Sequence, residues 1–411
     1  MIDKDRLVKI IHQVLNAYPE LKGFDFSDII NLALRLNKYS KEIRPVFDAY
    51  LKENSDLEIF NGGMMNFGTL ATRVELDYLW IWLLIRSANK GIEDTVEKLE
   101  KYLAIDVVPG YDVLIIEGLQ INKILELSSG ISLIPVTDLL PSMYKQSFLQ
   151  KSILTPTDIL CQQPKENNEA ALICHSSGGR KTRSEAFEGL PTLYNPRTKE
   201  LEEACFCLTL IDQCCPTPKL HWWDAEEWVP CSPPLGAGGG MPIYDVINRS
   251  SFNFDSQENR EKAQEIHKLF TAISTSMRQR LKVPLERLNQ AKRRVRVVDR
   301  AIDLGIALES LLLQEDSSGQ IALTFRLRAA WLLGDSNEGD RKANYDLFKL
   351  LYECRSKAVH KGELDDNIRG IPTVQVIDKG IQAAAKAIEI IMRQRSFPDW
   401  DSLILNITKG G

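Results

Sequence analysis

The spacing of apolar residues changes twice along this 411-residue chain, and those changes restrict the folds open to it. Residues 1–105 and 256–411 repeat apolar side chains at the period of an amphipathic helix. Residues 106–255 instead contain short apolar runs bounded by glycine and proline, which is typical of strands. We therefore expect a multidomain α+β protein with a helical N-terminal region, a β-rich middle domain and an all-α C-terminal helical bundle.

In the first two regions the pattern predicts particular elements. Leu7, Ile11 and Val14 share one helix face, and Pro19 ends that helix. One long helix is expected over residues 69–103, with its tryptophans in the core. Strands of the middle domain are expected at residues 113–119, 131–135, 170–174 and 205–211.

Two segments of the middle domain are expected at its surface. The glycine-rich run at 236–240 lacks the Lys-Ser/Thr pair of a phosphate-binding loop, so it is interpreted as a flexible connection. His221, Trp222 and Trp223 are interpreted as exposed aromatic residues.

The C-terminal region predicts several antiparallel helices. An apolar stripe through Ile266 and Met277 is expected to break at Pro284, because proline cannot continue a helical hydrogen-bond ladder. Further helices are expected around residues 285–314, 321–334, 340–360 and 374–395. Short connections between helices favour a bundle.

Composition limits the partners and the compartment. The net charge of −5 argues against a surface covered in nucleic acid, although a local basic patch is compatible with it. The most apolar run, at residues 79–85, is far shorter than the ~20 residues that span a bilayer. The first residues mix acidic and basic side chains and do not resemble a secretory leader. We expect a cytoplasmic protein without a membrane partner.

Seven of the eight cysteines lie between Cys161 and Cys231, which raises the question of a zinc site. Paired CxxC knuckles are absent, and the CxC and CC spacings present suit tetrahedral zinc poorly. We therefore expect reduced, buried cysteines in strands, with no metal and no cofactor. Zinc binding is the less favoured alternative.

An arginine and a histidine five positions apart carry the main chemical signal. Arg355 can clamp a phosphate, and His360 can transfer protons near neutral pH. RNA can be cleaved by such a pair without a metal, because its own 2′-hydroxyl supplies the nucleophile. Glu309 and Arg355 each fall on an apolar helix stripe, so we expect them to pair. A purely structural ion pair is the alternative.

His360 falls on a polar stripe, where an ordinary surface histidine is the alternative to a catalytic one. Five residues along an ideal helix rotate by about 140°, so Arg355 and His360 diverge unless the last turn frays at Gly362.

The surroundings of this motif resemble a known family. Asp299-Arg300-Ala301-Ile302-Asp303 precedes Ala307-Leu308-Glu309-Ser310-Leu311, and Phe325 to Gly334 and Tyr352-Glu353-Cys354 lead into the motif. In this order, residues 278–395 resemble the HEPN superfamily, particularly its ApeA-like branch of prokaryotic anti-phage proteins. The middle region also resembles the segments that precede HEPN domains in ApeA-like proteins.

The resemblance implies roles for the matching residues. His360 would be the general acid/base, Arg355 would hold the scissile phosphate, and Glu309 would orient Arg355. Ser356 stands where many family members carry Asn, Asp or His, which makes efficient catalysis less certain. The resemblance also implies a homodimer through the bundle, with both motifs at a shared cleft.

A basic run and two lysines next to the motif are candidate RNA contacts, with a solvated helix face as the equal alternative for the run. These candidates are Lys292, Arg293, Arg294, Arg296, Lys357 and Lys361.

The sequence thus favours a metal-independent endoribonuclease that acts in anti-phage defence, by abortive infection, or as a toxin. Residues 1–255 would restrain it or respond to a phage-derived or other protein trigger. The alternative is a weak or inactive HEPN module for dimerisation or RNA binding. A toxin silenced by tyrosine modification is disfavoured, because the family's tyrosine is replaced here by Gly362.

Overall fold

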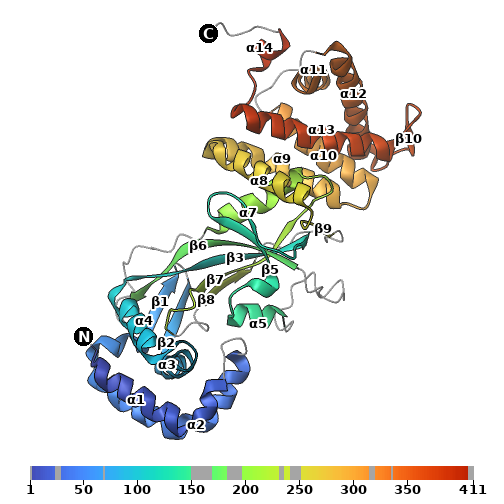
Figure 1. Cartoon of the computed structure of the whole chain (residues 1–411). Helices are drawn as coiled ribbons and strands as arrows, with labels where there is room; N and C mark the ends of the chain where they lie inside the picture. Colours follow the sequence, from blue (N-terminus) through green and yellow to red (C-terminus); the bar gives the residue numbers. More distant parts are fainter. Residues whose placement is uncertain are drawn as a thin grey trace.

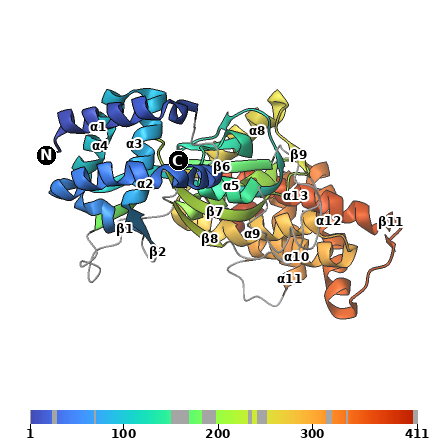
Figure 2. The same cartoon turned by 90° about the horizontal axis from the view of Figure 1, so that it is seen from below.

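The computed structural model of this chain describes residues 2–23, 29–67, 70–149, 169–182, 197–230, 236–240, 251–313, 320–334 and 337–405. Helices occupy both ends, and a sheet lies between them in both views (Figures 1 and 2). The expected mixture of helix and sheet in this order is confirmed.

The N-terminal helices are α1 (Lys4–Ala17), α2 (Ile29–Glu53), α3 (Leu76–Lys90) and α4 (Ile92–Ala104). The expected single helix over residues 69–103 is wrong in two respects. Residues 70–75 form a strand, and Gly91, at φ 99°, separates α3 from α4 in a backbone conformation that favours glycine. Trp80 and Trp82 are buried in the core of this region, as expected.

The central sheet has the strand order β2-β1-β6-β3-β7-β8, with β4, β5 and β9 attached at its side. Two of its strands, β1 and β2, come from the region expected to be helical, so the sheet begins before residue 106. The strands are β1 (Asn61–Phe67), β2 (Leu70–Glu75), β3 (Val107–Gln120), β4 (Leu125–Glu126), β5 (Ile131–Pro135), β6 (Glu169–Thr182), β7 (Thr217–Ala225), β8 (Gly236–Gly240) and β9 (Phe252–Asn253).

Strand β3 is the centre of this sheet and is buried on both faces. It pairs with β6 and β7, both antiparallel, and Ile115 lies opposite Ala171 and Leu220. Val113 and Ile115 pack on one face, whereas Leu114 and Ile116 pack on the other, against the core that reaches the C-terminal helices. Continuous burial explains why this segment has an unbroken apolar run.

Three expectations about the middle region are wrong. Residues 205–211 are not a strand but the end of α7 (Thr198–Cys207) and a 3₁₀ turn (Leu208–Leu210). The whole segment is buried, so its apolar run shows no period that separates helix from strand. The glycine run at 236–240 is strand β8, paired with β7, rather than a flexible connection. His221, Trp222 and Trp223 are buried rather than exposed.

The C-terminal helices are α8 (Gln257–Ala272), α9 (Thr275–Arg293), α10 (Val297–Leu312), α11 (Ile321–Gly334), α12 (Glu338–Lys361), α13 (Thr373–Gln394) and α14 (Trp400–Ile404). Pro284 lies inside α9, so the expected break there is wrong. The chain turns ten residues earlier, where the side chain of Ser274 caps α9 by accepting from the N–H of Met277.

Strand β7 carries a buried acidic residue, Asp224, next to its buried tryptophans. Asp224 accepts a hydrogen bond of 2.6 Å from the indole N–H of Trp222, and burial raises the pKa of its carboxyl to about 7. An unfolded aspartate titrates near about 3.9. Between these pH values the folded protein holds a proton that the unfolded chain has lost.

We therefore predict that the free energy of unfolding falls as the pH rises from about 4 to about 7, by at most ~4 kcal/mol from this group. Asp224→Asn should flatten that slope, because the residue no longer titrates. Urea denaturation from pH 4 to pH 8 measures it, with the exposed Asp106→Asn as the control. Equal slopes for the parent and Asp224→Asn would contradict the prediction.

Candidate functional site

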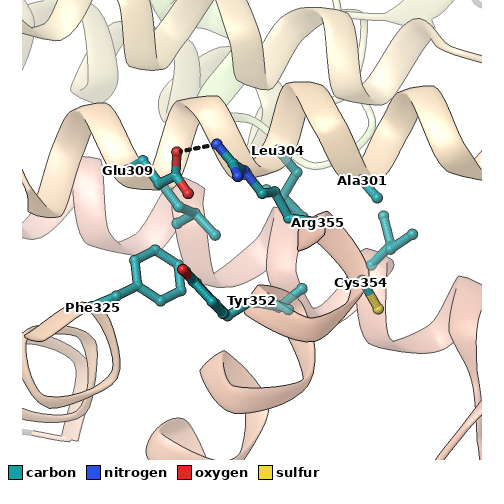
Figure 3. Close-up of a pocket in the computed structure, with 11 residues that line it drawn as sticks. Ala301, Leu304, Glu309, Phe325, Tyr352, Cys354 and Arg355 are labelled. Carbon is teal, nitrogen blue, oxygen red and sulfur yellow. Dashed lines mark hydrogen bonds and ion pairs between the residues drawn. The ribbon is translucent and has the colours of Figure 1, made fainter. Parts of the chain in front are cut away.

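The candidate site is built on α10 and α12, which carry Glu309 and Arg355. The guanidinium Nη2 of Arg355 donates to the carboxylate Oε2 of Glu309 at 3.0 Å (Figure 3). The side chains are 30% and 24% exposed, so the pair lies at the edge of the core and is within reach of solvent. The predicted pairing of these two residues is confirmed.

The pair borders a small pocket whose floor is apolar. Phe325 of α11 and Tyr352 of α12 lie beside it, with ring centroids 6.0 Å apart (Figure 3). These walls restrict the directions open to the Arg355 side chain. The pocket is lined by Ala301, Leu304, Gly305, Leu308, Glu309, Phe325, Leu351, Tyr352, Cys354, Arg355 and Ile377.

Gly305 of α10 is the residue that lets Arg355 reach Glu309, and the sequence reasoning missed it. A Cβ atom at this position would lie 2.3 Å from Cγ of Arg355, far inside van der Waals contact. The absence of a side chain therefore makes room for the arginine stem to cross α10. A glycine inside an otherwise apolar helix was the available signal.

His360 lies apart from this pair, at the end of α12. The helix is continuous through Lys361, and Gly362, at φ 72°, caps it with an N–H bond of 3.1 Å to the carbonyl of Ala358. The fraying that would turn His360 toward Arg355 is therefore not observed. His360 is exposed, as its polar stripe predicted.

Val359, one turn beyond Arg355 on α12, is 47% exposed. The buried stripe of α12 runs through Leu351, Cys354 and Ala358, which puts Arg355 and Val359 at its margin.

The polar residues next to the motif differ in their exposure and in their bonds to other side chains. Ser356 is half-buried and Lys361 is exposed. Lys357 lies 3.1 Å from Asp365 and 3.3 Å from Glu353, and these hydrogen bonds raise its pKa. Lys357 therefore ties the loop after α12 back to the helix, and RNA would have to compete with two carboxylates for it.

The basic run at the end of α9 is partly engaged inside the protein. Lys292 donates to the backbone carbonyls of Thr209 at 2.6 Å and Cys214 at 3.3 Å, and burial lowers its pKa. Arg293 is buried and donates to the side chain of Asn289 at 2.8 Å. RNA contacts from Lys292 or Arg293 would require these bonds to open.

The other two cations of the run are nearer the surface. Arg294 is half-buried and bonds to Asp303 at 2.8 Å, whereas Arg296 is exposed.

The cysteines are buried thiols. Cys174, Cys205, Cys207, Cys214 and Cys215 are buried, and burial raises the pKa of the Cys174 thiol to about 12. Cys205 and Cys207 lie in helix α7, so the expectation that they belong to a strand is wrong. Within the described ranges, no group of three or more His, Cys, Asp or Glu residues is placed to hold a metal ion. Cys161 and Cys231 lie outside those ranges.

A buried acid–histidine contact in the sheet was not anticipated. His221 Nε2 lies 3.0 Å from Asp112 Oδ1 and 3.0 Å from Thr198 Oγ1. A proton relay needs the carboxylate and the hydroxyl on opposite ring nitrogens, but here they share one. Asp112 also accepts the backbone N–H of Arg197 at 3.0 Å, so the cluster anchors the start of α7 to β3.

Comparison with protein-family models, with curated proteins and with solved structures found no match to this chain. The likeness to HEPN proteins is therefore a prediction from the motif and its surroundings. None of the helices in the described part of the chain combines the length and apolar character needed to cross a bilayer.

We predict that Gly305→Ala destabilises the protein by about 1–3 kcal/mol, because the new methyl group meets the Arg355 stem. In an Arg355→Ala background the same change should cost at most about 1 kcal/mol, since the contacts with Cγ and Cδ are gone, the tight contact with Cβ at 3.1 Å remains, and alanine favours helix. Chemical denaturation of the four members of this cycle measures the difference. Gly23→Ala, with open space around its Cβ, is the control.

The smaller cost of Gly305→Ala in the Arg355→Ala background is the decisive result of that cycle. An equal effect of Gly305→Ala in both backgrounds would show that Arg355 does not depend on the space above Gly305.

Proposed function

We propose that this protein is a metal-independent endoribonuclease whose C-terminal bundle cleaves RNA. One observation carries the proposal. Arg355 of α12 is held by Glu309 at 3.0 Å, and the last turn of the same helix α12 bears the exposed His360. The acid fixes the direction of the guanidinium, and a partly exposed guanidinium suits the non-bridging oxygens of a phosphodiester.

The chemistry requires no metal. One His360 takes the proton of the ribose 2′-hydroxyl, whose oxygen attacks the adjacent phosphorus, while Arg355 neutralises the charge that develops on the phosphoryl oxygens. The 5′-oxygen leaves with a proton from a second acid. The products are a 2′,3′-cyclic phosphate and a 5′-hydroxyl.

A second copy of the chain supplies what one copy lacks. Arg355 and His360 are separated by about 140° around one continuous helix, so they converge poorly on a single phosphate. We propose a homodimer through the bundle that places both motifs at one cleft, with one His360 as base and the other as acid. Exposed Val359, next to His360, is an apolar residue that such an interface would bury.

The biological setting follows from the resemblance alone. We propose a cytoplasmic effector of anti-phage defence or a toxin, restrained by residues 1–255 until a phage-derived or other protein trigger acts. The candidate RNA contacts are Arg294, Arg296, Lys357 and Lys361. Lys292 and Arg293 could contact RNA only if their hydrogen bonds inside the protein open.

The competing function is an inactive bundle that dimerises or binds RNA without cleaving it. Two observations favour it: the divergence of Arg355 and His360 along α12, and the engagement of Lys357 by Asp365 and Glu353. Ser356, where many family members carry a more strongly polar residue, points the same way.

We predict that the purified protein cleaves RNA in excess EDTA and that His360→Ala lowers the rate by about 10²–10⁴, the usual effect of losing a general acid or base. His12→Ala, which removes another exposed histidine, should cleave like the parent. Thermal melts of both variants should match the parent. Parental cleavage by His360→Ala would place the active site elsewhere, and no cleavage by the parent would favour the inactive bundle.

We also predict a homodimer at micromolar concentration, measured by light scattering. Val359→Asp should shift the mass to that of a monomer, because burying an unpaired carboxylate is unfavourable. Val295→Asp alters a residue that is 81% exposed between α9 and α10 and is the matched control. A parent that is a monomer and still cleaves RNA would contradict the dimeric site.

A further inference from the structure

A second cavity lies where the sheet meets the C-terminal bundle, far along the chain from Arg355. Its walls come from α7, from the turn between β4 and β5, and from α8 and α9, which Figure 1 shows next to one another. Its volume is about 370 Å³, within the range of small-molecule sites. Polar side chains dominate the lining, including Lys199, Glu200, Glu203, His267 and Arg278.

His267 is a buried member of the cavity lining. Its Nδ1 accepts the backbone N–H of Ser128 at 3.0 Å, so the ring proton of the neutral form is on Nε2. The residue is 1% exposed, and burial lowers its pKa to about 4, so the ring stays neutral at pH 7. His267 therefore adds no charge to the cavity.

Arg278 carries a hydrogen-bond donor in the lining that lacks an acceptor. Its Nη1 and Nη2 make long bonds of 3.3 Å to Glu203 and Thr275, while its Nε is buried without a partner in the part of the chain that the structure describes. Among the described residues, the Nε–H of Arg278 therefore lacks an acceptor, and a buried N–H in this state is unfavourable unless a ligand or water accepts from it.

The acidic residues of the lining already have cationic partners. Glu200 bonds to Nε of Arg197 at 2.9 Å, and Glu203 lies 3.3 Å from Arg278 and 4.0 Å from Lys199. The groups around the cavity that still lack a hydrogen-bond partner are therefore donors. An anionic acceptor would supply the missing hydrogen bonds.

We propose that this cavity binds a small molecule carrying a phosphate or carboxylate group. The anion accepts from Nε–H of Arg278, beside the neutral ring of His267, with the ammonium of Lys199 at the rim. Its walls belong to both the sheet region and the bundle, and Ser128 already links them through His267 and Thr271. A bound anion therefore tightens the contact between the two regions. The site stands independently of the proposed ribonuclease.

Isothermal titration calorimetry on the full-length protein tests the proposal. Inorganic phosphate and acetate are titrated separately, with sodium chloride at matched ionic strength as the reference. We expect saturable binding of at least one of the two anions. Arg278→Gln should weaken it about tenfold or more, because a charge-assisted hydrogen bond is lost.

Two further variants locate the binding. Thr275→Trp puts a large side chain into the lining and removes the hydroxyl that bonds to Arg278, so it should abolish binding in a protein whose melting temperature reports correct folding. Lys268→Gln removes an exposed charge of α8 outside the lining and should bind like the parent.

The outcomes of the titrations distinguish the two classes of ligand from each other and from a failure of the proposal. Phosphate binding alone identifies a phosphorylated ligand, and acetate binding alone identifies a carboxylate. The proposal is overturned if neither anion binds above the chloride reference, or if binding survives both Arg278→Gln and Thr275→Trp.

Discussion

One apolar core joins the central sheet to the C-terminal bundle, and the position of both candidate sites depends on it. It runs without interruption from Leu114 and Ile116 of β3, through α7, to Ile391 and Met392 of α13. Polar ties reinforce it, since Asn289 of α9 donates to Thr209 at 3.0 Å and to the carbonyl of Pro216 at 2.8 Å. Separating the bundle from the sheet would expose this core to water, which is unfavourable.

The Glu309–Arg355 pair is best understood as a positioning device. A pair this exposed contributes only about 0–1 kcal/mol to stability, because water and salt screen it. Its effect is directional: the carboxylate fixes one end of the arginine, while the open face at Gly305 sets the path of the stem. The same arrangement leaves part of the guanidinium accessible, which a purely structural pair in a closed core would not.

The sequence predicted those features that depend on local periodicity. Helices α1, α11, α12 and α13, strands β3 and β5, the start of β6, the Glu309–Arg355 contact and the exposure of His360 follow from which residues share a face, whereas the expected helices over residues 69–103 and 285–314 are each divided in the structure. It failed where burial removes the period: residues 205–211 are buried throughout, so helix and strand leave the same pattern. It also missed contacts between distant segments, such as Lys292 with the carbonyl of Thr209 and Asp112 with His221, because no local signal specifies a partner about a hundred residues away.

The end of α12 decides how Arg355 and His360 can act together. For them to meet within one chain, the last turn would have to unwind, breaking the bond between Gly362 N–H and Ala358. That bond is worth only about 1 kcal/mol, but Lys357 adds resistance by holding Asp365 of the following loop against the helix. The left-handed conformation of Gly362 also stabilises the existing end, as at many helix C-termini. In the proposed dimer, two intact helices from two chains would bring an arginine and a histidine together without breaking any of these contacts.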